Sequence, residues 1–233
     1  MGKGRAYRPR LDTSKVSAFQ RRLLAWFRRN GRDLPWRRTR DPYKILVSEV
    51  MLQQTQVERV RDYYERFLRE YPTVQDLAAA RPARVRESWD GLGYYARARN
   101  LHAAARAIAR RHGGQMPRRL EDLLALPGVG RYTAGAVASF AYGEAAPTLD
   151  TNVRRVLSRI FVWRQATRLA ERERRLWAVA QAVIPEGDAW AMNQALMDFG
   201  ATVCVARNPR CPVCSVRSLC VFYERGQQSK RTR

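Results

Sequence analysis

Residues 120–142 read LEDLLALPGVGRYTAGAVASFAY, and this stretch predicts one helix, a tight turn and a second helix. Gly128 and Gly130 flank Val129 in the turn, and glycine lets the backbone bend sharply and come close to another molecule. The backbone amides at the start of the second helix form a site for an anion. The alternative is an ordinary turn between two helices that binds nothing.

The net charge of the chain indicates which anion the turn would bind. The 233 residues include 44 Lys and Arg against 21 Asp and Glu, a net charge of +23, and the basic residues are spread along the whole chain. A polyanion is the expected partner, and duplex nucleic acid is the commonest one. We therefore expect the turn to hold a DNA phosphate, a contact that positions the protein without reading sequence. The alternative is general arginine enrichment or heat adaptation, although heat adaptation ordinarily raises Glu together with Lys.

Nearly every other segment is also predicted to be helical, so the expected fold class is all-α. Besides the two helices of the hairpin, the predicted helices are Ser14–Asn30, Pro42–Val57, Glu58–Glu70, Val74–Ala80, Pro82–Trp89, Tyr95–His112, Asn152–Val162, Glu171–Ile184 and Ala189–Val203. No segment alternates as a strand, and no apolar run approaches the ~20 residues that span a membrane. The polar, basic first ten residues and the tail after Arg225 are expected to be loosely ordered.

Four cysteines lie close together near the end of the chain. Six residues separate Cys204 from Cys211, two separate Cys211 from Cys214, and five separate Cys214 from Cys220. Four thiolates this close can surround one metal centre. Two disulfides are the alternative, but the N-terminus lacks the apolar core of an export signal, and in a reducing cytosol such a cluster more often binds metal. Zinc usually takes two closely spaced cysteine pairs, and only one is present, so the spacing favours iron–sulfur.

Together, the hairpin and the cysteines resemble those of the helix-hairpin-helix DNA glycosylases that carry an iron–sulfur cluster, the endonuclease III superfamily. Asp150, within the segment LDTNV at 149–153, matches the catalytic aspartate of this family. The segments SEVMLQQTQV at 48–57 and GLGYYARARNL at 91–101 look like the branch of the MutY adenine glycosylases. These motifs follow one another in the family's order from about Leu34 to Cys220.

The resemblance implies a two-lobed, all-α fold with the active cleft between the lobes. The implied parts are a six-helix barrel at 34–142 with its helix-hairpin-helix at 118–142, a second helical domain from 1–33 and 143–224 with a cluster loop at 204–220, and a basic tail at 225–233. The implied cofactor is a [4Fe–4S] cluster on the four cysteines. The resemblance also allows a monovalent cation at the hairpin.

Two carboxyl groups in different environments can divide the cleavage of an N-glycosidic bond, because positive charge builds on the deoxyribose and negative charge on the leaving base. Glu49 stands among apolar neighbours and is expected to keep its proton near neutral pH, which suits protonation of a purine. Asp150 begins a helix, whose N-terminal partial charge should keep it ionised. The resemblance assigns them these same roles and places Tyr132 at the base pocket. The alternatives are an exposed helical position for Glu49 and a simple helix cap for Asp150.

The resemblance also implies a set of DNA contacts, and they fall on Gln53, Gln54, Tyr94, Arg97, Gly128, Val129, Gly130 and Arg131. Because the target base must be flipped out of the stack, the vacated space has to be filled. Gln54 and Tyr94 match the residues that the family uses as wedges, and Arg97 is expected to touch phosphates. The alternatives are core packing for Tyr94 and a solvated helix face for Arg97.

These residues predict a monofunctional DNA glycosylase that releases adenine opposite guanine or 8-oxoguanine from mismatched double-stranded DNA. The alternatives are a glycosylase for thymine or uracil opposite guanine, a bifunctional glycosylase/lyase, and a non-catalytic DNA-binding module. A lyase needs a reactive lysine, whereas Tyr132 occupies the family's lyase position. The chain ends soon after Cys220, so we expect it to lack the domain with which most MutY proteins inspect 8-oxoguanine. We expect a cytoplasmic, nucleoid-associated monomer that binds no membrane.

Overall fold

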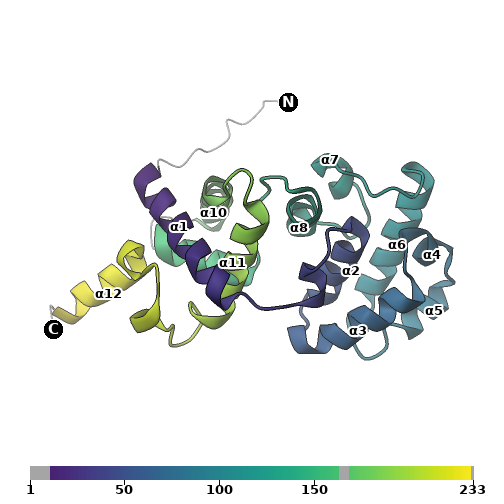
Figure 1. The fold of residues 1–233 in the computed structure, drawn as a ribbon, viewed down its shortest axis with the longest axis horizontal. Coiled ribbons are helices and arrows are strands. Elements are labelled where there is room, and N and C mark those ends of the chain that lie inside the picture. Colours follow the sequence, from purple (N-terminus) through teal and green to yellow (C-terminus); the bar gives the residue numbers. More distant parts are fainter. Residues whose placement is uncertain (1–10, 163–167, 232–233) are drawn as a thin grey trace. The chain divides into compact units, whose positions relative to one another are not determined.

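The computed structural model describes residues 11–162 and 168–231, and every regular element in these ranges is a helix, which confirms the expected all-α class (Figure 1). The chain divides into two compact units. Unit 1 comprises Met1–Arg32 and Ala145–Arg233, and unit 2 comprises Asp33–Glu144. No helix in the described ranges is long and apolar enough to cross a membrane.

Unit 2 is built around one buried helix, α2. Its elements are η1 (Pro35–Arg37), α2 (Pro42–Leu52), α3 (Val57–Glu70), α4 (Val74–Ala79), α5 (Pro82–Glu87), α6 (Ala96–Arg111), α7 (Leu120–Leu124) and α8 (Arg131–Tyr142). Helix α2 packs against α3, α6 and α8, while α4 packs against α6. Every side chain from Ile45 to Met51 is buried. This part of α2 has no solvent face, so its polar groups need partners inside the protein.

Local signals in the sequence explain where α2 begins. Oδ1 of Asp41 accepts the backbone N–H groups of Tyr43 at 2.8 Å and Lys44 at 3.2 Å, as an N-cap does. Pro42 takes the first helical position, where a missing N–H costs nothing. Asp41 and Pro42 together therefore fix the start of the helix that carries Glu49.

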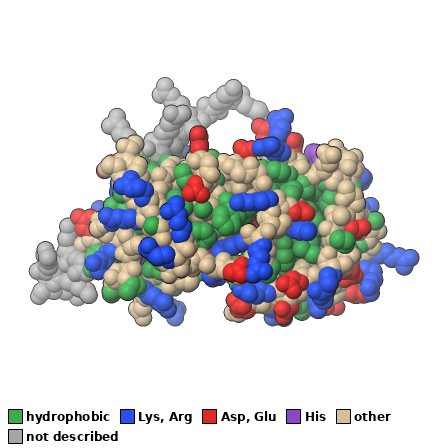
Figure 2. Space-filling model, in the orientation of Figure 1, with side chains coloured by type: hydrophobic (Ala, Val, Ile, Leu, Met, Phe, Trp, Pro, Cys, Tyr) green, Lys and Arg blue, Asp and Glu red, His purple; other side chains and the backbone are tan. Residues whose placement is uncertain are grey.

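Unit 1 combines the first long helix with the helices of the second half of the chain. Its elements are α1 (Thr13–Asn30), α9 (Thr151–Leu157), the π-helix η2 (Ser158–Val162), α10 (Leu169–Val183), α11 (Ala189–Thr202), the short η3 (Cys211–Val213) and η4 (Arg217–Leu219), and α12 (Val221–Arg231). Helix α11 packs against both α1 and α9. In the core, the rings of Trp26 and Phe199 meet edge to face with centroids 5.0 Å apart. Figure 2 shows many Lys and Arg side chains on the visible surface among fewer Asp and Glu, as the charge of the chain requires.

Two expected helices differ from the structure by more than two residues at one end. The expected helix Pro42–Val57 ends at Leu52, because Gln54 takes a left-handed backbone conformation with a φ of 56°. The expected helix Asn152–Val162 is α-helical only to Leu157 and continues as a π-helix, a distortion that side-chain periodicity does not reveal.

The last described residues are more regular than expected. Residues after Arg225 were expected to be loosely ordered, but helix α12 continues to Arg231. The expectation for the first ten residues lies outside the described residues.

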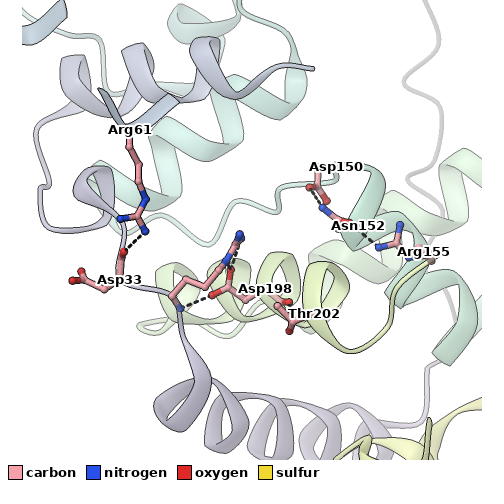
Figure 3. A network of polar contacts seen from close by, with 8 residues as sticks. Asp33, Arg61, Asp150, Asn152, Arg155, Asp198 and Thr202 are labelled. Atoms are coloured by element: carbon pink, nitrogen blue, oxygen red, sulfur yellow. Dashed lines mark hydrogen bonds and ion pairs between the residues drawn. The ribbon is translucent and has the colours of Figure 1, made fainter. Parts of the chain in front are cut away.

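The chain leaves unit 1 at Arg32, which is fastened to α11 by a buried carboxylate. The backbone N–H of Arg32 donates to Oδ2 of Asp198 at 2.9 Å, and its Nε donates to Oδ1 at 2.7 Å (Figure 3). The Asp198 side chain is 0 % exposed, whereas that of Arg32 is 33 % exposed. The buried negative charge is thus both paired and hydrogen-bonded, which is the condition under which such a charge is tolerated.

Replacing Asp198 by alanine is expected to destabilise the protein, because it removes the buried acceptor of the Arg32 donors. The free energy of unfolding, measured by urea denaturation, should fall by about 3 kcal/mol, the lower end of the range for a broken buried pair, since Arg32 is partly exposed. Asp33→Ala is the control: it removes an ion pair with Arg38 in which both side chains are 69 % exposed, and should change nothing measurable. Equal losses of unfolding free energy in the two variants would contradict the role of Asp198 as the buried partner of Arg32.

Candidate active site

Glu49 lies in the buried part of α2 and meets a side chain from the hairpin helix. Glu49 is 4 % exposed, and the hydroxyl of Tyr132 donates to its Oε2 at 2.7 Å. Tyr132 is the second residue of α8, so the packing of α2 on α8 brings the two side chains together. This burial excludes the alternative that Glu49 lies on an exposed face of its helix. The hydrogen bond also brings together two residues that the sequence analysis had placed in the active site.

The hairpin has the backbone that its glycines predict. Gly128 has a left-handed φ of 73°, and a Cβ added there would lie 2.5 Å from Cβ of Asn100. The N–H of Val129 donates to the carbonyl of Leu126 at 3.1 Å and closes the turn. Gly130 begins α8 without a side-chain cap, and a Cβ added at this position would meet nothing within 4 Å. The space beside the first amides of α8 is therefore open at this point, as an anion site requires.

Four more of the predicted DNA contacts lie in unit 2. Gln53 follows α2, and its Nε2 donates to Oγ1 of Thr133 at 3.4 Å. Gln54 is exposed, and Tyr94 is 61 % exposed with a left-handed φ of 49°. This exposure removes the alternative of core packing for Tyr94. Arg131, the first residue of α8, is also exposed.

Arg97 is not where the sequence placed it. Its side chain is 8 % exposed, and its guanidinium donates to backbone carbonyls at the end of α2 and in the turn before Tyr94. The expected phosphate contact and the expected solvated face are therefore both corrected. The sequence gives no signal of this burial, because an arginine in a helix normally reaches water.

Asp150 caps helix α9 in unit 1. Its Oδ1 accepts the N–H of Val153 at 2.6 Å. Its Oδ2 accepts a hydrogen bond from Nδ2 of Asn152 at 3.2 Å (Figure 3). Burial raises the pKa of Asp150 above its ordinary 3.8, and these two hydrogen bonds only partly oppose the rise. The helix terminus alone would lower this pKa, whereas burial has the larger effect here. The expectation that Asp150 is ionised near neutral pH stays a prediction.

Asn152 and Arg155 extend the contacts of Asp150 toward the cysteine loop. Nη2 of Arg155 donates to Oδ1 of Asn152 at 2.7 Å (Figure 3). The same Nη2 donates to the carbonyl of Gly200 at 2.7 Å, and Nε of Arg155 donates to the carbonyl of Cys204 at 2.7 Å. A Cβ at Gly200 would lie 2.7 Å from Cβ of Asn152, so glycine permits this close packing of α11 on α9. Sequence reasoning gave neither residue a role, although Asn152 lies within the LDTNV segment at 149–153.

The four cysteines line one cavity in unit 1, together with Arg159, Arg210 and Arg217. All four are free thiols, so the alternative of two disulfides does not hold. Nη1 of Arg159 donates to Sγ of Cys204 at 3.4 Å and to the carbonyl of Val205 at 2.8 Å. Burial raises the pKa of Cys214 to about 11, so this thiol needs a cationic centre to be deprotonated at neutral pH.

The arrangement of the thiols fits a cluster better than a single ion. In the part of the chain that the structure describes, no three Cys, His, Asp or Glu side chains are placed to hold one metal ion. Tetrahedral zinc would need its sulfurs about 2.3 Å from one point. The four thiols instead surround a cavity, which is what a polynuclear centre bound by four cysteines requires. The three arginines that line the cavity would offset the negative charge of the thiolates.

Comparison with curated proteins gives relatives over most of the chain. It is 44 % identical over 228 residues to the adenine DNA glycosylase of Homo sapiens, a match that covers 94 % of this chain and 42 % of the relative. It is 38 % identical over 217 residues to the thymine-DNA glycosylase of Aeropyrum pernix, covering 91 % and 97 %. The chain therefore spans less than half the length of the human relative and almost the whole of the archaeal one.

Comparison with solved structures gives the same fold. A thermostable thymine-DNA glycosylase superposes with a TM-score of 0.85 at 34 % identity, covering 91 % of this chain and 98 % of that one. A trapped covalent intermediate of endonuclease III with DNA superposes with a TM-score of 0.78 at 26 % identity, covering 93 % and 99 %. A family model described as HhH-GPD superfamily base excision DNA repair protein matches residues 47–181, a stretch that includes Glu49, the hairpin and Asp150. The chain therefore belongs to the HhH-GPD superfamily of base excision DNA repair proteins.

Proposed function

We propose that this protein is a monofunctional DNA glycosylase that releases adenine mispaired with guanine or 8-oxoguanine. The observation that carries the proposal is the buried carboxyl of Glu49, hydrogen-bonded to Tyr132 on the hairpin helix. Similarity to adenine DNA glycosylases supports the same base, at 44 % identity for Homo sapiens and 46 % for Mycolicibacterium smegmatis.

The two carboxyl groups divide the chemistry. Glu49 gives its proton to N7 of adenine, so that the bond between the base and C1′ breaks and the base leaves as a neutral molecule. The carboxylate of Asp150 stabilises the positive charge that develops on the deoxyribose. Water then adds to C1′ and gives a proton to the carboxylate of Glu49, which restores the starting protonation state of Glu49. No lysine is required, and Tyr132 is committed to Glu49, so the reaction ends at the abasic site.

A second candidate is release of thymine or uracil opposite guanine. The observation that favours it is similarity: the chain is 38 % identical to the Aeropyrum pernix thymine-DNA glycosylase, and a thermostable thymine-DNA glycosylase superposes on it with a TM-score of 0.85. Thymine, however, has no ring nitrogen that would gain from a proton as N7 of adenine does. The placement of Glu49 in a buried, hydrogen-bonded position therefore favours adenine.

Duplex DNA is the partner, and unit 2 contacts it through the turn at 128–131 and through Gln54 and Tyr94. The open space beside Gly130 admits a phosphate to the amides of α8. The exposure of Gln54 and Tyr94 lets both side chains enter the stack once a base is flipped out. The complexes of endonuclease III with DNA, which share this fold, support the assignment.

The four cysteines hold a [4Fe–4S] cluster. When bound, the cluster supplies a rigid cross-link for the loop at 204–220 and takes no part in cleavage of the glycosidic bond. Arg159 also holds the loop, because its guanidinium donates hydrogen bonds to Sγ of Cys204 and to the carbonyls of Val205 and Ala206. The loop thereby presents basic residues such as Arg207 and Arg210 in a fixed position.

Base release from a panel of duplexes tests the proposed function. Duplexes with A·G, A·8-oxoG, T·G and U·G pairs are incubated with the protein, and the liberated bases are identified by mass spectrometry. Adenine should be released from the first two only. Thymine or uracil release with adenine untouched would establish the second candidate, and release from none would leave a DNA-binding module.

Glu49→Gln should lower single-turnover release of adenine by about a hundredfold or more, since a general acid contributes typically ~10²–10⁴-fold. Binding to the mismatched duplex, measured by fluorescence anisotropy, should stay nearly intact because the side chain keeps its shape. Glu58→Gln is the matched control, since the Glu58 side chain is 81 % exposed, and its rate should equal that of the wild type. Similar rates for the two variants would exclude Glu49 as the proton donor.

The rate of release should fall at acid pH with a midpoint above 3.8, because burial raises the pKa of Asp150 and its charge is needed. As the pH drops through this raised pKa, the carboxylate takes up a proton and no longer stabilises the sugar cation. A single-turnover pH–rate profile measures the midpoint, and circular dichroism at each pH shows that the fold persists. A midpoint at or below 3.8 would contradict the role of Asp150 as a partly buried carboxylate.

Purified protein is expected to be brown and to contain iron together with acid-labile sulfide, because four cysteines line one cavity. Cys214→Ser should lose the colour and most of the iron, whereas Ser215→Ala, which alters the neighbouring residue but no thiol, should keep both. Metal analysis of anaerobically prepared protein is the measurement. Stoichiometric zinc without sulfide would overturn the cluster assignment.

A further inference from the structure

We propose that Arg97 is a positioning residue that holds two exposed residues, Gln54 and Tyr94, in the backbone conformation needed to enter the DNA stack. The inference rests on the proposed function, since it concerns how the protein replaces a flipped base. It assigns Arg97 no contact with DNA.

One guanidinium joins two segments that are far apart in the sequence. Its hydrogen bonds go to the carbonyls of Val50 (3.0 Å), Met51 (2.7 Å) and Gln53 from Nη1, and to those of Leu92 (3.3 Å) and Gly93 (3.1 Å) from Nη2. One nitrogen thus serves the end of α2, and the other serves the turn that precedes α6. The carbonyls at the end of α2 have no partner within the helix, and the guanidinium supplies it.

Two of these carbonyls control the residues that follow them. The carbonyl of Gln53 belongs to the peptide bond that leads into Gln54, and the carbonyl of Gly93 belongs to the one that leads into Tyr94. Fixing each peptide plane restricts the backbone rotation of the residue after it. Arg97 therefore acts on Gln54 and Tyr94 through the backbone.

Gln54 and Tyr94 both have strained backbones. Their φ angles are 56° and 49°, and in the described ranges Asn208 is the only other residue besides glycine with a positive φ. Such a conformation costs free energy and persists only where the surroundings enforce it, which is typical of functional sites. In this unit the enforcing group is the guanidinium of Arg97.

The position cannot be filled equally well by another cation. No ion pair of Arg97 occurs within the described residues, so carbonyl dipoles and ring faces stabilise its charge. The guanidinium carbon lies 5.6 Å from the ring centroids of both Trp89 and Tyr94. Arginine presents donors on two nitrogens in a rigid fork, whereas the single ammonium of lysine cannot reach both segments at once.

The first test compares Arg97→Lys with Arg106→Lys, an exposed position on the same helix. Single-turnover release of adenine is measured from an A·8-oxoG duplex and from an unpaired adenine in a one-nucleotide bulge. Arg97→Lys should slow release from the duplex by about tenfold or more, as expected for loss of a charge-assisted hydrogen bond. Release from the bulge should change by less than about threefold, because that base needs little help to leave the stack. Arg106→Lys should match the wild type on both substrates.

Equal losses on the two substrates would overturn the proposal, because Arg97 would then support the pocket of Glu49 through α2. A rate for Arg97→Lys equal to that of the wild type would overturn it as well. Wild-type protein that releases no base from either substrate would instead refute the proposed function. The two failures are thus distinguishable.

A double-mutant cycle tests whether Arg97 acts through Tyr94. With Tyr94→Ala as background, adding Arg97→Lys should slow duplex release by less than about twofold, because the side chain that Arg97 positions is already absent. Multiplicative losses would show that Arg97 acts independently and would contradict the proposal.

Hydrogen exchange gives a readout that does not depend on activity. In Arg97→Lys and Arg97→Gln, amide exchange should accelerate in peptides covering 52–56 and 92–96, and stay unchanged in peptides from α3 and α8. All assays are run below the melting temperature of each variant, and the glutamine variant serves if the lysine variant does not fold. Unchanged exchange in 52–56 and 92–96 would contradict the positioning role.

Discussion

Burial of helix α2 is the constraint from which the rest of unit 2 follows. Because the helix has no solvent face from Ile45 to Met51, every polar group on it or at its ends must be satisfied from inside. Asp41 satisfies its first amides, Tyr132 satisfies the carboxyl of Glu49, and Arg97 satisfies its last carbonyls. Each of these partners comes from a different segment. The same bonds that make the burial tolerable therefore fix the hairpin helix and the turn of Tyr94 around the carboxyl.

In unit 1, the polar groups at the start of α9 also need partners inside the protein, and an arginine and backbone carbonyls provide them. Arg155 binds the carbonyls of Gly200 and Cys204 and the amide of Asn152, which in turn binds Asp150. The aspartate is thereby held by hydrogen bonds at both oxygens, although burial raises its pKa. A carboxylate that is held rigidly and is partly shielded from water interacts strongly with a nearby positive charge. Stabilisation of a sugar cation requires such an interaction.

The sequence predicted features that depend on local chemistry. Glycines in the hairpin, the Asp41-Pro42 helix start and the spacing of the cysteines each have one physical reason that acts within a few residues. Arg97 was misplaced because its role depends on the packing of α6 on α2, a contact that helical periodicity does not encode. The raised pKa of Asp150 was missed for the same reason, since burial is a tertiary property. The π-helix η2 has no signature in the spacing of the side chains along the sequence.

The central claim is that a proton from Glu49 reaches N7 of the leaving adenine. Replacing N7 by a C–H group tests it most directly, because 7-deazaadenine keeps the shape and pairing edge of adenine but cannot accept that proton. Single-turnover release is measured for adenine and 7-deazaadenine opposite 8-oxoguanine, with binding of both duplexes measured in parallel. The account predicts equal binding and no release of 7-deazaadenine by the wild type. Release of both bases at similar rates would contradict it.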